Sequence, residues 1–233
     1  MTMAFANSNY YSSSGGSEVG NNFASYNAAG VNTGVYAPGL DLRSVFTDNS
    51  GSVLARAFNS RTIYKMGSVG SFASLLSLQG GTLDAQSSVD MNDAGNFVAN
   101  SGGHVSVWNA SGVLLNSFSL TGFTGGYPAN RGIAATQDYL LTYDSGLLKA
   151  WDYKGNLLDS TSLIGAGNSF DSNFSLSFAN NHVFVVDTAG GTWRGYDLGL
   201  GAKVNDVPEP ASLALFSIAL GAGIVARRRK SRV

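Results

Sequence analysis

The sequence contains no cysteine, only four prolines and few charged side chains, which make up 12% of its 233 residues. The absence of cysteine excludes disulfide bonds, thiolate catalysis and zinc sites built from cysteine. It does not settle the compartment, because the cytosol and a bacterial exported protein that folds without oxidation both accommodate it. Thirty glycines beside four prolines predict many tight turns rather than a rigid proline-rich spacer.

The few charges are divided unevenly along the chain. Five of the 14 basic residues lie within the last seven positions, so residues 1–210 carry nine basic and 15 acidic groups. A body of this net negative charge repels phosphate backbones, and we therefore expect no nucleic-acid binding. Thirteen of the acids are aspartate and two are glutamate, a bias typical of turns rather than of helix faces.

The last 27 residues, VPEPASLALFSIALGAGIVARRRKSRV, are unlike the rest of the chain. Residues 211–226 carry no charge, and as a helix they would span roughly 24 Å of a bilayer core about 30 Å thick. Arginine side chains that reach the interface would cover the difference. Because the basic residues follow the apolar run, the positive-inside rule predicts a transmembrane helix with residues 1–210 outside the cytoplasm. The alternative, a buried core helix, is disfavoured because the run has no polar face.

The order of these elements closely resembles the PEP-CTERM sorting signal of Gram-negative bacteria. The resemblance implies an exosortase that recognises the motif Val207, Pro208, Glu209, Pro210, and a stop-transfer segment of Arg227, Arg228, Arg229 and Lys230. It also implies export across the inner membrane, followed by tethering or release at the cell surface. Members of this family commonly accompany exopolysaccharide and biofilm formation. Alanine replacement of the Pro-Glu-Pro motif should leave the tail uncleaved in the native host, and unchanged processing would contradict this role.

The N-terminus lacks the features of a complete export signal. MTMAFANS has neither a basic region nor an apolar stretch of about 7–15 residues. Ala4-Phe5-Ala6 resembles the end of a signal peptide, so we interpret it as a leader remnant with the true start upstream. A chance Ala-Phe-Ala is the alternative. Because residues 7–21 are rich in Ser, Asn and Gly, we expect residues 1–21 to be disordered.

The body between the two ends repeats. HVSVWNASGVLLNSFSL and LLKAWDYKGNLLDSTSL share an alternating run, an aromatic residue, a turn and a second run. The recurring aromatics are separated by 38, 44, 43 and 45 residues, and they are Tyr26, Tyr64, Trp108, Trp151 and Tyr196. Each unit reads as four short antiparallel strands joined by tight turns. The period is that of a propeller blade, so residues 22–206 predict an all-β, β-propeller-like array.

The number of units and the closure of the ring stay open at this level. Residues 43–205 supply about four units, and residues 22–42 read as the last two strands of another. A ring of four or five blades, closed by N-terminal strands that pair with the last unit, is one interpretation. A fragment with earlier blades upstream is another, and an open β-sandwich or solenoid is the alternative architecture.

Two short segments resemble the start of a calcium loop. Asp90 and Asn92 occupy its first two ligand positions, and Asp171 and Asn173 begin a similar run. Neither segment has the closing glutamate that such a loop needs. We therefore expect Asx turns and no cofactor, with weak calcium binding left as an alternative.

No nucleophile elbow, phosphate loop, zinc helix or dinucleotide fingerprint occurs in the sequence. His104 and His182 fall at different places in the repeat, which does not indicate a metal pair. Glycoside cleavage usually needs two carboxylates, and the two glutamates, Glu18 and Glu209, lie outside the repeats. We therefore expect no enzymatic activity. A polysaccharide-acting hydrolase or lyase that uses aspartates is the alternative.

The aromatic residues have two interpretations. Those that recur once per unit indicate packing between blades. Others lie in or beside loops next to polar residues, and we name Tyr127, Tyr153 and Phe123 as candidate contacts to sugar rings. Together with the tail, this pattern predicts a non-catalytic structural or binding component of the extracellular matrix or exopolysaccharide. Its expected partners are an exosortase, the membrane and the exopolysaccharide.

Overall fold

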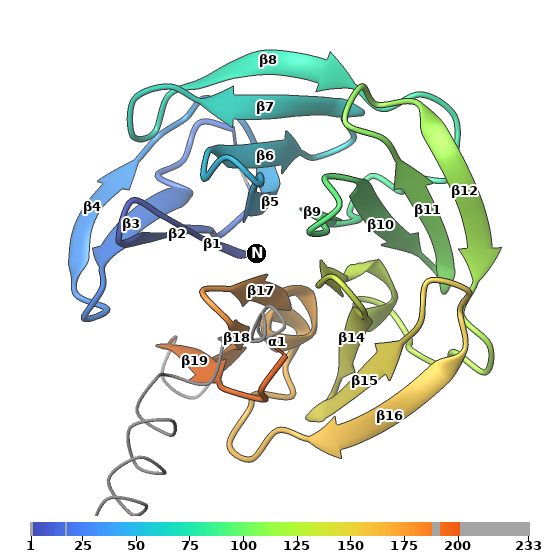
Figure 1. The fold of residues 1–233 in the computed structure, drawn as a ribbon. Coiled ribbons are helices and arrows are strands. Elements are labelled where there is room, and N and C mark those ends of the chain that lie inside the picture. The colour runs from blue at the N-terminus through green and yellow to red at the C-terminus, as the bar shows by residue number, and fades with distance from the viewer. Residues whose placement is uncertain (1, 17, 188–191, 201–233) are drawn as a thin grey trace, which may run out of the picture. The chain divides into compact units, whose positions relative to one another are not determined.

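The computed structural model describes residues 2–16, 18–187 and 192–200. Their strands form five antiparallel sheets in chain order, which we call blades 1 to 5 (Figure 1). Blade 1 contains β1 (Met3–Ala6), β2 (Asn9–Ser13), β3 (Phe23–Asn27) and β4 (Asn32–Tyr36), and blade 2 contains β5 (Leu42–Thr47), β6 (Val53–Ala57), β7 (Thr62–Met66) and β8 (Phe72–Ser77). Blade 3 contains β9 (Val89–Met91), β10 (Phe97–Ser101), β11 (His104–Trp108) and β12 (Leu114–Ser119), and blade 4 contains β13 (Ala134–Ala135), β14 (Leu140–Asp144), β15 (Leu147–Trp151) and β16 (Leu157–Ser162). Blade 5 contains β17 (Ser177–Ala179), β18 (His182–Asp187) and β19 (Thr192–Tyr196).

The blades form a ring, with the first strand of each blade nearest the axis (Figure 1). Each innermost strand packs against that of the next blade, and β1 packs against β17 to close the circle. At this closing contact, the Met3 amide donates to Ser177 Oγ (2.7 Å), and the Met3 side chain packs with Ala179 and Phe184. The body is therefore a five-bladed β-propeller, and the predicted fold class is confirmed for this part of the chain.

One expectation about the N-terminal region was wrong. Residues 3–6 and 9–13 are strands, although we expected residues 1–21 to be disordered. The serine- and tyrosine-rich composition hides an alternation in which Tyr11 is buried and stacks on Phe23, with ring centroids 5.9 Å apart. β1 and β2 also complete blade 1 with β3 and β4, instead of pairing with the last blade. Residues 22–42 do hold the last two strands of a unit, as predicted.

The recurring aromatics end the third strand of their blades or lie within it, and most of them mark a bulge. The register to the fourth strand shifts at Tyr26, Tyr64, Trp108 and Trp151. The two tryptophans are 0% exposed and lie in separate hydrophobic clusters between blades. Their predicted role in packing is confirmed.

The residues that follow Trp108 and Trp151 form the turn to the fourth strand of their blades. Asn109 Oδ1 accepts from the amides of Ser111 and Val113, and Asp152 Oδ1 accepts from two amides in the same pattern. Gly155 adopts a φ of 86° and lies so close to the Ser119 carbonyl oxygen that a Cβ would clash with it. This explains why the Trp-Asn/Asp pair precedes a glycine in each repeat.

Hydroxyl side chains near the axis hydrogen-bond each blade to a neighbour. In each case a backbone amide of one innermost strand, or of the residue just before it, donates to a Ser or Thr hydroxyl of the adjacent blade. The donor and acceptor pairs are Val45 to Thr2 (2.5 Å), Val89 to Ser44 (3.1 Å), Ile133 to Ser88 (3.0 Å) and Met3 to Ser177 (2.7 Å). These buried amides are thus satisfied without strand pairing between blades.

The C-terminal calls lie outside the residues that the structure describes. They are the transmembrane helix expected at residues 211–226, the motif Val207–Pro210 and the basic end Arg227–Lys230. No helix within residues 2–16, 18–187 and 192–200 is long and apolar enough to cross a membrane.

Candidate functional site

One end of the ring gathers the longer connections. Strands alternate in direction, so the loops between second and third strands and the connections between blades all emerge at the same end, here called the loop end. The loop end includes residues 14–22, 78–88, 120–133 and 163–176. It also holds the two short helices, η1 (Ala129–Arg131) and α1 (Phe170–Phe174).

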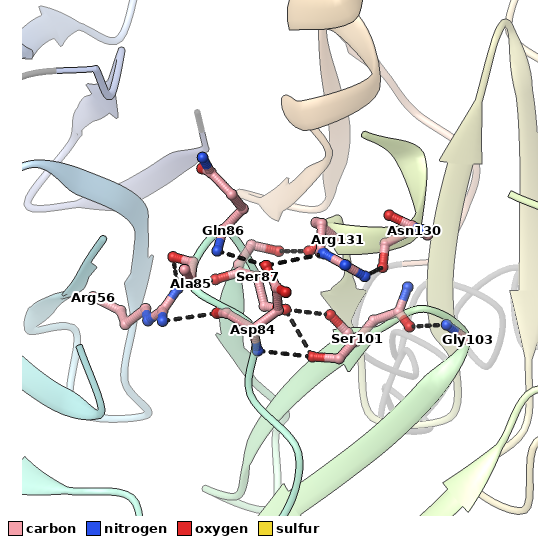
Figure 2. Close-up of polar contacts among 11 residues, drawn as sticks. Arg56, Asp84, Ala85, Gln86, Ser87, Ser101, Gly103, Asn130 and Arg131 are labelled. Atoms are coloured by element: carbon pink, nitrogen blue, oxygen red, sulfur yellow. Dashed lines mark hydrogen bonds and ion pairs between the residues drawn. The ribbon is translucent and has the colours of Figure 1, made fainter. Parts of the chain in front are cut away.

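The connection between blades 2 and 3 is held by a buried arginine (Figure 2). Arg56, on β6, is 1% exposed and donates to four backbone carbonyls. Nε donates to Ser60 (2.7 Å), Nη1 to Ala85 (3.0 Å) and Ser87 (2.6 Å), and Nη2 to Asp84 (2.9 Å). Burial lowers the pKa of Arg56 to about 10, so the guanidinium remains charged at neutral pH.

The same connection is tied to the following blade. Asp84 forms an ion pair with Arg131 (3.0 Å), and its amide donates to Ser101 Oγ (3.0 Å). Ser87 Oγ donates to the Asn100 carbonyl (2.6 Å). Figure 2 shows the side chain of Gln86 extending away from these contacts. The network therefore fixes a short backbone segment that presents Gln86.

A pocket of about 230 Å³ lies at the loop end and is lined by residues from three inter-blade connections, from the β2–β3 loop of blade 1 and from β5 of blade 2. We call it the axial pocket. Its lining consists of Ser14, Gly16, Arg43, Gln86, Ser88, Tyr127, Phe170, Asp171 and Phe174. Since these residues come from blades 1 and 2 and from the three following inter-blade connections, only the closed ring assembles the site.

Three aromatic rings form one wall of the axial pocket. Tyr127, Phe170 and Phe174 contact one another edge to face, with centroids 5.2–5.7 Å apart. Tyr127 is 57% exposed and Phe170 is 54% exposed. The α1 helix positions the two phenylalanines on one face, at i and i+4, and Ser169 caps it by accepting from the Ser172 amide (3.1 Å). Exposed aromatic faces beside polar groups are typical of a ligand site.

The polar part of the axial pocket is mostly uncharged. Ser14, Gln86 and Ser88 contribute hydroxyl and amide groups, and Asp171 is the one carboxylate among the lining residues. Arg43 is paired with Asp41 (2.6 Å) and its guanidinium lies 4.9 Å from the centre of the Phe58 ring. The site therefore offers hydrogen bonds and aromatic surface rather than a strong field of one sign.

The structure does not bring the three predicted sugar contacts together. Tyr127 lies in the axial pocket. Phe123 packs on Trp151, with centroids 6.1 Å apart, and Tyr153 Oη donates to the Thr136 carbonyl (2.7 Å) at the opposite end of the ring. The predicted set of Tyr127, Tyr153 and Phe123 lacks Phe170 and Phe174, for which the available signal in the sequence is a serine followed by two phenylalanines four residues apart.

Three of the four residues in the predicted calcium-loop segments accept hydrogen bonds from backbone amides of the protein. Asp90 accepts from the amides of Met91 and Ala135 (2.8 Å each), and Asn92 Oδ1 accepts from the Asn96 amide. Burial raises the pKa of Asp90 to about 7. Asn173 lies on α1 and accepts from the Ser145 amide (2.8 Å). In the part of the chain that the structure describes, no three His, Cys, Asp or Glu side chains are grouped to hold a metal ion.

In a comparison with protein families, residues 206–230 match the PEP-CTERM protein-sorting motif. This chain carries a PEP-CTERM motif. The predicted resemblance is confirmed, and the PEP-CTERM motif implies export, sorting at the membrane-associated cell surface and processing by an exosortase. A comparison with the curated proteins found no match.

Several solved structures resemble the propeller. A Bacteroides caccae protein of unknown function is 17% identical, with a TM-score of 0.46 over 82% of this chain and 69% of that one. A streptogramin B lyase is 14% identical, with a TM-score of 0.44 over 84% of this chain and 67% of that one. PorZ, a surface component of the Porphyromonas gingivalis type-IX secretion system, is 12% identical, with a TM-score of 0.43 over 78% of this chain and 23% of that one. At these scores the likenesses carry no argument about function.

Proposed function

We propose that this protein is a non-catalytic component of the extracellular matrix that binds exopolysaccharide at the axial pocket. The observation that carries the proposal is the cluster of the exposed Tyr127 and Phe170 with the half-buried Phe174, beside hydroxyl and amide groups. The electron-rich face of an aromatic ring attracts the weakly positive C–H hydrogens on one face of a sugar ring. The neighbouring polar groups suit the sugar's hydroxyls.

The composition of the pocket supports binding over cleavage. Glycoside hydrolysis usually places two carboxylates on either side of the scissile bond. Asp171 is the one carboxylate in the lining, and the buried Asp90 lies outside it with both oxygens hydrogen-bonded. The PEP-CTERM motif supports the proposal because it implies export and sorting at the cell surface.

Pull-down of the full-length chain with the exopolysaccharide of the producing organism tests this function. We expect retention of the glycan with an unchanged size distribution on chromatography. Replacing Tyr127 and Phe170 by alanine should weaken binding at least tenfold, because each lost aromatic contact is worth about 1 kcal/mol. The melting temperature should change little, since both rings are more than half exposed.

Phe123→Ala provides the matched control. Phe123 packs on the buried Trp151, so its loss should lower stability and leave glycan affinity unchanged. Shortened glycan chains would instead favour a hydrolase or lyase, and absence of retention would contradict the proposed function.

A further inference from the structure

A second pocket lies at the loop end where blades 1 and 5 meet, and we call it the junction pocket. It has a volume of about 300 Å³. Its walls come from the facing ends of β2 and β3 in blade 1 and of β18 and β19 in blade 5, with Trp193 and Tyr26 among the lining residues. Within the same junction, Met3, Ala179 and Phe184 form a hydrophobic cluster, and Trp193 packs against it.

The junction pocket lies beside the axial pocket. Ser14 and Asp171 line both cavities, and both residues are exposed. We call the two adjoining pockets together the cleft.

Alternation along β2 and β3 decides which side chains face the junction pocket. Tyr10 contacts Phe184 of blade 5, with ring centroids 5.4 Å apart, so Ser12, two residues further along β2, faces blade 5 as well. Tyr26 pairs with Tyr10 and shares this face. The wall of the pocket therefore combines the Ser12 hydroxyl with the aromatic rings of Tyr26 and Trp193.

We infer that the junction pocket is a second sugar subsite, so that the cleft binds an extended segment of polysaccharide rather than a single sugar or a chain end. The inference rests on the proposed function and extends it to the length of the ligand. Trp193 supplies aromatic surface, as Tyr127 and Phe170 do in the axial pocket, and Ser12 and Asn21 supply polar groups. Asp171 lies where a chain that spans both subsites would pass and can accept hydrogen bonds from its hydroxyls.

Binding of an oligosaccharide ladder to the full-length protein tests the inference. The ladder is prepared by partial acid hydrolysis of the producing organism's exopolysaccharide and separated into oligomers of about one to eight sugars. We expect affinity to rise at least tenfold from the shortest bound oligomer to the longest. Trp193→Ala should abolish this rise and leave the affinity for the shortest bound oligomer unchanged.

Two further variants keep the test decisive. Arg194→Ala is the matched control, because Arg194 follows Trp193 on the same strand and points to the opposite face, where it pairs with Asp187 (2.6 Å). It should retain the full rise in affinity. Asn21→Ala changes an exposed loop residue and should lower the affinity for long oligomers only, which replaces Trp193→Ala if that variant does not fold.

The outcomes separate the two proposals. Short oligomers that bind as tightly as long ones would overturn the second subsite and leave the proposed function standing. A rise with length that survives both Trp193→Ala and Asn21→Ala would overturn it as well. If no oligomer of any length binds, the proposed function itself fails.

Discussion

Two junctions of the same ring are built in opposite ways. Between blades 2 and 3, the guanidinium of Arg56 fills the loop end of the junction and donates to four carbonyls. Between blades 5 and 1, the corresponding space is a pocket of about 300 Å³ whose lining includes Ser12, Tyr26 and Trp193. The comparison shows that a few side chains decide whether two neighbouring blades are joined by hydrogen bonds at the loop end or leave a pocket there.

Removing the Arg56 side chain should weaken the junction of blades 2 and 3 and produce the largest effect on stability. We expect Arg56→Ala to lower the free energy of unfolding by about 3–5 kcal/mol, because four buried carbonyls lose their donor. Urea-induced unfolding measures this loss. Arg194→Ala, which removes an exposed ion pair, is the control and should change stability far less. A similar loss in both variants would contradict the special role of Arg56.

The junction of blades 3 and 4 should make stability depend on pH through Asp90. Burial raises the pKa of Asp90 to about 7 in the folded protein, above the value of about 3.9 expected when unfolded. The folded state then binds this proton more tightly than the unfolded state, so protonation of Asp90 stabilises the protein at low pH. This contribution is lost as the pH rises from about 4 to 7, and stability no longer depends on pH through Asp90 above about pH 7. The expected slope approaches 1 kcal/mol per pH unit near pH 6.

Unfolding of the wild type and of Asp90→Asn at several pH values isolates this contribution. The asparagine does not titrate, so the difference in unfolding free energy between the two proteins should change between pH 5 and 7 and level off above. A difference that is constant over this range would show that Asp90 titrates normally.

Substitution of two buried serines, Ser88 and Ser13, should give the smallest changes in the free energy of unfolding. Ser88→Ala should cost about 1–2 kcal/mol, because the buried Ile133 amide that donates to Ser88 Oγ (3.0 Å) loses its acceptor. Ser13→Ala should change the free energy of unfolding by less than about 0.5 kcal/mol, since its hydroxyl has no partner to lose among the described residues. Thermal unfolding compares them. A larger loss for Ser13→Ala would mean that its hydroxyl makes a stabilising hydrogen bond in the folded protein.

Much of the architecture was determined by local sequence pattern. The aromatics spaced by 38 to 45 residues, the alternating runs and the Asn/Asp-to-Gly turns predict four-stranded units, because bulges, turns and half-buried strands depend on neighbours within one blade. The tail motif is likewise a contiguous stretch and is recognisable without a structure. The N-terminal strands escaped prediction, since their serine-rich composition resembles disorder until Tyr11 is seen buried against Phe23.

The candidate site was decided by tertiary structure. Tyr127 and Phe170 are 43 residues apart, and Ser13 and Trp193 lie 180 residues apart on the first and last blades. No local pattern relates them, because their proximity depends on how many blades close the ring and which blades then become neighbours. The sequence by itself determined the repeating unit and the sorting address of this protein. Closure of five such units decided where aromatic and polar groups converge and which junction stays open.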